Sequence, residues 1–182
     1  ERLVEKASGT TYEEFVRKNQ FERVGLRHTF FGADLGRVPR ETLAAGDRHK
    51  RFLSDPKLID PTEPATGTSA KPSPRAIYSS ARDISLWDIA LAGEVLIEDP
   101  ALRKLLYVPG EAKQVGAWSF PGHPGLMIAT GSANGFSSLL SRYTDPSELV
   151  CVTLLANREG LDLHALAERI AAAHNAKLAP KR

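Results

Sequence analysis

The sequence predicts an α+β fold in which helices and a long irregular segment come first, followed by an antiparallel strand meander and a closing helix. Apolar residues recur at helical spacing before residue 110, and strand-like runs replace them afterwards. Residues 32–74 show little periodicity and are rich in proline, which is typical of an irregular surface segment. We therefore expect a helical and loop region over residues 1–110 and strands plus a C-terminal helix over residues 111–182.

Two helices are expected near the start of the chain. Residues 3–9 are typical of a helix end closed by Gly9, because glycine tolerates the positive φ found just past a helix C-terminus. Thr11 and Glu14 have the spacing of a capping box that opens the second helix. Residues 21–31 indicate a helix exit and a turn. The inner side of the second helix is expected to carry Tyr12, Phe15 and Val16.

Two more helices follow the irregular segment. Ser80 and Asp83 form a second capping-box pattern, and Gly93 ends the periodic run. Asp99 followed by Pro100 fits a cap with proline at the first helical position. The apolar residues of these two helices are Ile84, Trp87 and Leu91 in the first, and Leu102, Leu105 and Leu106 in the second.

Strand patterns dominate the rest of the chain, over residues 115–120, 126–130, 136–143 and 149–155. A turn at residues 145–147 predicts that the last two strands form an antiparallel pair. Asp162 then caps a final helix. Its apolar face is expected to consist of Leu163, Leu166, Ala167, Ile170 and Ala171.

Composition narrows the range of functions. The formal net charge of +2 is too small to indicate nucleic acid or an anionic membrane surface as a partner. No stretch is apolar enough to cross a bilayer, and no signal peptide is visible. The single cysteine, Cys151, excludes an intrachain disulfide and a cysteine-based zinc site, and we interpret it as a small buried residue. We expect neither a metal ion nor an organic cofactor.

One motif carries the functional prediction. Residues 129–137 read Ala-Thr-Gly-Ser-Ala-Asn-Gly-Phe-Ser, and an apolar strand pattern ending in Asn157 follows them. This stretch resembles the third active-site motif of serine hydrolases of the class C β-lactamase and penicillin-binding protein type, in which (Lys or His)-Thr-Gly lies on a strand. Residues 5–21, 24–29 and 78–87 are similar to three further family patterns, in the family's order.

The resemblance implies the C-terminal portion of a β-lactamase-like or penicillin-binding-protein-like fold. It also implies a parent that cleaves an amide or ester through an acyl-serine intermediate. By the same resemblance, Ala129, Thr130 and Gly131 lie along the substrate, and the backbone N–H of Ser132 is one of two oxyanion donors. The alternative is a glycine-containing strand edge kept for packing.

The family's other two motifs are not evident in this chain. Ser54 and Lys57 form the one Ser-x-x-Lys match, but Pro56 and Pro61 leave too short a run for a buried helix, so we interpret Ser54 as part of a loop. Tyr-x-Asn is absent, and Asn134 in Ser-Ala-Asn is interpreted as a chance match inside the strand motif. We expect the nucleophile to lie upstream of residue 1 and this chain alone to be inactive.

Ala129 stands where the family usually places Lys or His. Its methyl group cannot pair with a substrate carboxylate, so an esterase or peptidase-like activity is expected rather than efficient β-lactam hydrolysis. His123 could replace the cation, although a solvent-exposed turn is the simpler interpretation. The rival hypothesis is a non-catalytic binding or structural relative that kept the fold.

Partners are inferred from the missing part of the fold. A sheet without its partner strands would present an open edge and an apolar face, so we expect association with the missing N-terminal half or with another copy of the chain. The resemblance implies a small-molecule or peptide substrate. It also suggests the periplasm or cell envelope as the compartment, with a cytosolic location left open.

Overall fold

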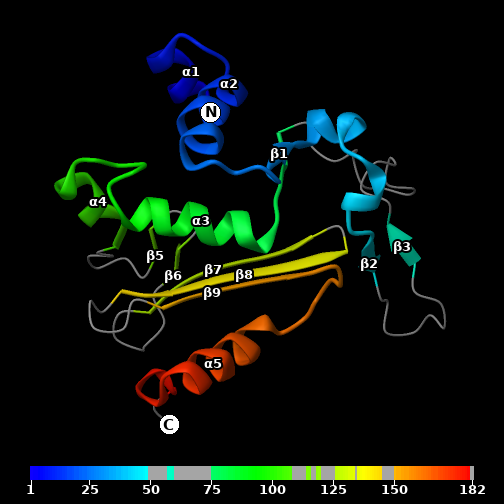
Figure 1. Cartoon of the computed structure of the whole chain (residues 1–182), viewed down its shortest axis with the longest axis vertical. Helices are drawn as coiled ribbons and strands as arrows, with labels where there is room; N and C mark the ends of the chain where they lie inside the picture. Colours follow the sequence, from blue (N-terminus) through cyan, green and yellow to red (C-terminus); the bar gives the residue numbers. More distant parts are fainter. Residues whose placement is uncertain are drawn as a thin grey trace. The chain divides into compact units, whose positions relative to one another are not determined.

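The computed structural model describes residues 1–48, 57–59, 75–107, 114–115, 118–119, 126–133, 135–144 and 150–180 (Figure 1). Ser54, His123, Asn134 and the expected turn at residues 145–147 lie outside these ranges. The chain divides into two compact units. The helical unit comprises residues 1–42 and 64–103, and the sheet unit comprises residues 43–63 and 104–182.

The helical unit begins with α1 (Arg2–Ser8) and α2 (Tyr12–Val16). Gly9 ends α1 with a φ of 71°, as the sequence predicts. The capping box at the start of α2 is also confirmed. The Glu14 N–H donates to Thr11 Oγ1 at 3.3 Å, and the Thr11 N–H donates to Glu14 Oε2 at 3.1 Å. Accepting this N–H lowers the pKa of the Glu14 carboxyl.

The second helix continues as a π-helical segment, η1 (Arg17–Glu22), and ends at Gly25, whose φ is 78°. The N–H groups of Gly25 and Leu26 both donate to the Phe21 carbonyl, at 2.9 and 2.8 Å. This closure brings apolar side chains into one core. Its buried members are Val16, Phe21, Leu26 and Phe31, with Tyr12, Phe15, Val24, Leu86 and Trp87 packed against them.

Residues 21–31 are more than a helix exit and turn. Phe30 and Phe31 form strand β1 (Phe30–Phe31), which pairs antiparallel with β4 (Ile77–Tyr78). The expectation missed this pair because a two-residue strand has no periodicity and its partner is far along the chain. The segment expected to be irregular also contains η2 (Gly32–Arg37), η3 (Arg40–Thr42) and, in the sheet unit, a β2 (Gly46–Arg48)–β3 (Lys57–Ile59) pair.

Helix α3 (Ala81–Ala92) begins with half of the expected capping box. Ser80 Oγ accepts the Asp83 N–H at 3.1 Å, but the Asp83 carboxylate does not return to Ser80. It instead accepts from the His28 N–H at 2.7 Å and from Thr29 Oγ1 at 2.8 Å. Sequence spacing could not reveal this, because the competing donors lie 55 and 54 residues away.

Helix α4 (Pro100–Tyr107) is capped as predicted, with Asp99 Oδ1 accepting the Ala101 N–H at 2.7 Å. Two of its three leucines, Leu102 and Leu105, are exposed.

The sheet unit contains five antiparallel strands in the order β5-β6-β7-β8-β9, which confirms the predicted meander. The single strand expected over residues 115–120 is in fact two short strands that pair with each other. Strand β7 runs three residues further than residue 130. The strands are β5 (Gln114–Val115), β6 (Trp118–Ser119), β7 (Leu126–Ala133), β8 (Phe136–Tyr143) and β9 (Cys151–Ala156).

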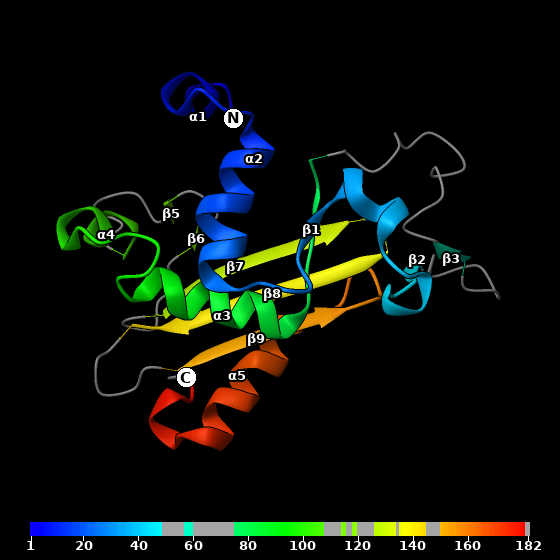
Figure 2. The same ribbon diagram turned by 45° about the horizontal axis from the view of Figure 1, so that its top comes forward.

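Helix α5 (Leu163–His174) packs along one face of strands β8 and β9 (Figures 1 and 2). Asp162 Oδ1 caps it by accepting the His164 and Ala165 N–H groups, at 3.1 and 3.5 Å. Leu166 and Ile170, expected on its buried face, are 44% and 41% exposed, because the buried stripe of α5 is narrow and consists of Leu163, Ala167 and Ala171. The core of this unit consists of Leu126, Ile128, Leu139, Tyr143, Val152, Leu163, Ala167, Ala171 and Leu178.

Cys151 is half-buried rather than buried, since it opens β9 at the end of the sheet order. Over the part of the chain that the structure describes, no helix has the length and apolar character needed to cross a membrane.

Candidate active site

The predicted site residues lie together at the end of β7, next to its hairpin with β8. In this pair Thr130 is opposite Leu139, and Ser132 is opposite Ser137. Gly135, in the connection between the strands, has a φ of 83°, a value that glycine adopts at little cost. Ala129 is half-buried, and residues 130–132 are exposed to solvent. Their catalytic roles stay predictions.

The alternation along β7 divides these residues between two faces of the sheet. Ile128 belongs to the core under α5, so Thr130 and Ser132 share its face. Ala129 and Gly131 therefore lie on the other face. Along the described part of β6, pairing with β7 is limited to Ser119 with Ile128, so no described strand pairs with that edge of β7 from residue 129 to 133. An extended segment of substrate could add to such an edge.

Gly131 has a structural requirement of its own. A Cβ atom built on it would lie 2.9 Å from Ser138 Oγ, closer than real Cβ contacts. The Ser138 hydroxyl also points to the Gly131 carbonyl, at 3.5 Å. Any side chain at this position would require Ser138 Oγ to shift, so packing favours glycine here whether or not a substrate binds.

The loop between β9 and α5, residues 157–161, contacts the hairpin from the α5 side. Its Gly160 N–H donates to Ser132 Oγ at 3.2 Å. The Ser132 hydroxyl is therefore engaged with this loop, on the face opposite Ala129 and Gly131. The Gly135 N–H donates to Glu159 Oε2 at 3.0 Å.

Ser137, opposite Ser132, makes two more bonds to the same loop. Its Oγ donates to the Arg158 carbonyl at 2.8 Å and accepts the Leu161 N–H at 3.3 Å. The sequence motif does not predict that this β9–α5 loop is part of the site. A usable signal was present, because Ser137 is a polar residue at a strand position that the alternation assigns to the buried face.

Within the described residues, the Ser-x-x-Lys match can be followed only from Lys57. Lys57 begins strand β3, so the Ser54–Lys57 match is not followed by the helix that the family motif requires. Asn157, which follows β9, donates through Nδ2 to the Ala45 carbonyl at 3.0 Å and so connects the 43–48 segment to the sheet.

Charge close to the predicted site comes from the β9–α5 loop, where the Glu159 carboxylate accepts the Gly135 N–H. Ala129 offers none, and Arg142 on β8 is buried with its guanidinium 5.9 Å from the Tyr107 ring. Across the described ranges, no group of three or more His, Cys, Asp or Glu side chains could hold a metal ion.

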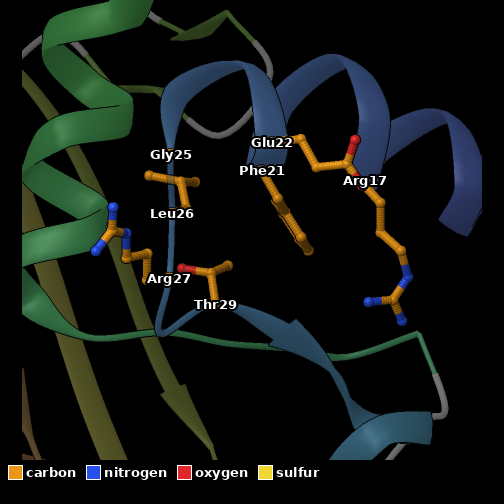
Figure 3. Close-up of a pocket in the computed structure, with 7 residues that line it drawn as sticks. All are labelled: Arg17, Phe21, Glu22, Gly25, Leu26, Arg27 and Thr29. Atoms are coloured by element: carbon orange, nitrogen blue, oxygen red, sulfur yellow. The ribbon is translucent and has the colours of Figure 1, made fainter.

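A pocket of about 330 Å³ lies in the helical unit (Figure 3). Phe21 and Leu26 supply apolar walls. Arg17 forms an ion pair with Asp34, and Thr29 Oγ1 bonds the Asp83 carboxylate, so these two polar groups are already engaged. This hollow contains none of the predicted site residues. Its lining residues are Arg17, Phe21, Glu22, Gly25, Leu26, Arg27 and Thr29.

Comparison with known proteins gives a family and a fold. The model of the family described as Beta-lactamase matches residues 1–176. Among solved structures, a penicillin binding protein from Bacillus halodurans is 21% identical with a TM-score of 0.67, and the match covers 96% of this chain and 52% of that chain. No curated protein matches the sequence significantly.

Two further solved structures are similar. FmtA from Staphylococcus aureus is 15% identical with a TM-score of 0.68, over 98% of this chain and 48% of that chain. A D-amino acid amidase from Ochrobactrum anthropi SV3, complexed with D-phenylalanine, is 22% identical with a TM-score of 0.60, over 86% and 48%. The chain therefore spans about half the length of the structures it matches, and the predicted fold is confirmed.

Proposed function

This chain belongs to the beta-lactamase family, and on that premise we propose that it is the C-terminal portion of a serine hydrolase that cleaves amide or ester bonds. The parent protein would react through an acyl-serine intermediate, with the nucleophile supplied by the part of the fold that this chain does not contain. The chain by itself is then inactive.

The observation that supports this proposal most is the exposed, open-edged end of β7. Residues 130–132 can align an extended substrate along the strand, and the Ser132 N–H can donate to the oxygen that becomes negative as the acyl carbon is attacked. Such a donor accelerates reaction because it binds charge that develops only in the transition state. The N–H of the nucleophilic residue would be the second donor.

Ala129 bears on the substrate class. A carboxylate next to the scissile bond would find no cation at this position. We therefore propose that the substrates are esters or amides, including peptides, whose binding does not depend on that carboxylate, rather than β-lactams. One structural neighbour is a D-amino acid amidase, which is compatible with amide hydrolysis on this fold.

The sheet unit offers a surface for the rest of the fold. Strand β9 is last in the sheet order, and among the described strands none pairs with its outer edge. Beside it, Leu166 and Ile170 of α5 are exposed. An open edge next to apolar side chains favours association. We propose that its occupant is the other half of the fold, since the structural neighbours are about twice as long.

The test is the intact mass of the full-length gene product after reaction with a fluorophosphonate, with the 182-residue chain treated in parallel. The expected result is one covalent adduct on the full-length protein and none on the chain. An adduct on the chain would place a reactive nucleophile within these 182 residues, with Ser54 as the first candidate.

A non-catalytic relative is the second candidate, and Ala129 is the observation that favours it. Labelling of neither protein would support this candidate over the hydrolase. A Ser-x-x-Lys before an apolar helix in the upstream reading frame would argue against it.

A further inference from the structure

We propose that the β9–α5 loop, residues 157–161, is a positioning element for the backbone N–H of Ser132, and that Ser137 is its principal anchor. The inference rests on the proposed function, because it concerns the proposed oxyanion donor. It assigns a role to residues outside the (Lys or His)-Thr-Gly triplet of the family motif.

Ser137 holds the loop through both capacities of its hydroxyl. The side chain is only 3% exposed and lies directly opposite Ser132 in the β7–β8 pair. Its Oγ donates to the Arg158 carbonyl at 2.8 Å and accepts the Leu161 N–H at 3.3 Å. A buried hydroxyl satisfied in this way fixes both ends of the turn that it binds. Loss of the hydroxyl would leave two backbone groups without that partner.

The loop in turn holds the end of β7 and the hairpin connection. The Gly160 N–H reaches Ser132 Oγ at 3.2 Å, and Glu159 Oε2 receives the Gly135 N–H at 3.0 Å. The hairpin is therefore bonded to one loop at three places: on β7, in the connection and on β8. Three separate attachments restrict rotation as well as translation of the hairpin tip.

The support from the loop matters because, beyond Ile128, no described strand pairs with the edge of β7 that faces away from β8. Pairing with β6 reaches only Ile128, so the segment that carries the Ser132 N–H is held by β8 and by the loop. A catalytic donor has to stay within about 0.5 Å of its productive position, and misplacement by about 1 Å can cost about 100-fold in rate. The loop thus sets the donor geometry from the face away from the substrate.

The sheet contains a matched control for this role. Ser141 lies on the same strand and the same face as Ser137 and is equally buried, at 3% exposed. Over the described part of the chain, its Oγ has no hydrogen-bond partner. Ser137→Ala and Ser141→Ala therefore make the same chemical change at similar burial, and only the first removes bonds to the loop.

The experiment uses the full-length gene product, with p-nitrophenyl ester turnover, phenylboronic acid inhibition and thermal unfolding as readouts. For Ser137→Ala we expect kcat to fall about 10-fold with KM nearly unchanged, and boronate binding to weaken by about the same factor, because the boronate occupies the oxyanion position. Ser137→Thr, which retains the hydroxyl, should recover most of kcat. Ser141→Ala should keep the wild-type kcat.

The possible results distinguish failure of the proposed hydrolase function from failure of the proposed role of the β9–α5 loop. If the wild-type protein neither turns over nor labels with a fluorophosphonate, the proposed function fails and takes this inference with it. If the wild type is active and Ser137→Ala matches Ser141→Ala in kcat and boronate affinity, only the inference is overturned. Should Ser137→Ala not fold, Ser132→Ala removes the acceptor of the Gly160 N–H from an exposed position and keeps the backbone donor. A kcat unchanged by that substitution would also overturn the inference.

Discussion

In the helical unit, side-chain hydrogen bonds join segments that are far apart in the sequence, whereas in the sheet unit each long strand pairs with the next one along the chain. Asp83 accepts from His28 and Thr29, which are 55 and 54 residues away, and Arg75 bonds Glu13 across 62 residues. The sheet unit's β7–β8 and β8–β9 pairs are sequential, and its β9–α5 loop reaches the hairpin over 21 to 28 residues.

This difference predicts which substitutions should destabilise each unit most. The helical unit combines a small aromatic core with polar side chains that have several partners, such as Arg75, which pairs with Glu1, Glu5 and Glu13. These ion pairs raise the pKa of Arg75, the largest contribution being its hydrogen bond to Glu1. The sheet unit spreads its stability over a continuous register and an apolar core. Substitution of one residue should therefore damage the first unit more sharply.

The largest expected effect is in the aromatic core of the helical unit. Phe31 is fully buried, with its ring 5.4 Å from that of Phe21 and 6.3 Å from that of Tyr12. Phe31→Ala should lower the free energy of unfolding by about 4 kcal/mol, measured by urea denaturation. Amide exchange should rise in the helical unit first. Equal acceleration of amide exchange in both units would contradict the expected difference between the helical unit and the sheet unit.

The next effect concerns the buried carboxylate of Asp83, which is 2% exposed. Asp83→Ala leaves the His28 N–H and the Thr29 hydroxyl without this acceptor and should cost about 3 kcal/mol of unfolding free energy. Asp99→Ala, at an exposed helix cap, should cost only about 1 kcal/mol. Similar losses for the two variants in urea denaturation would show that the long-range bonds add nothing beyond capping.

Gly131 gives a test inside the sheet unit. Gly131→Ala places a methyl group against Ser138 Oγ and should destabilise the sheet by about 2 kcal/mol. The same substitution in a Ser138→Ala background should cost much less, because the clashing oxygen is gone. A double-mutant cycle of unfolding free energies measures the coupling. Additive effects would mean that the close contact is not what requires glycine here.

The smallest effect is a pH dependence confined to the helical unit. Burial raises the pKa of the Tyr78 phenol above its usual value of 10.0. Because the folded state then holds the proton more tightly than the unfolded state, the contribution is fully present below pH 10.0 and is lost as pH rises through the higher folded pKa. Tyr78→Phe should remove this alkaline loss in a series of unfolding curves. An unchanged alkaline limb would contradict the assignment to Tyr78.

Much of the fold could be predicted because its signals are local. Gly9, the Thr11–Glu14 box, Asp99 and Asp162 cap helices where their spacing predicts, and residues 136–143 form the strand predicted for them. Each of these features depends on residues within one helical turn or one strand, so a short window contains the whole cause.

The missed features depend on partners far along the chain. The Asp83 carboxylate accepts hydrogen bonds from His28 and Thr29 instead of from Ser80, and β1 forms by pairing with β4. For the candidate site, the motif predicted the strand that carries residues 129–132, and the structure added the loop behind it. The polar Ser137 at a buried strand position indicates a hydrogen-bond partner, but the sequence does not show that the partner is residues 157–161, because that contact exists only in the folded chain.

The hydrogen bond from Asn157 to the Ala45 carbonyl has a kinetic consequence. It closes a loop of 112 residues with an exposed hydrogen bond, so it forms against a large closure entropy and gains little by itself. Sequential strand pairing closes far shorter loops, so β7, β8 and β9 are expected to assemble first. The 43–48 segment would then dock last during folding and detach first during unfolding. A probe placed there would report completion of the native state rather than formation of the sheet.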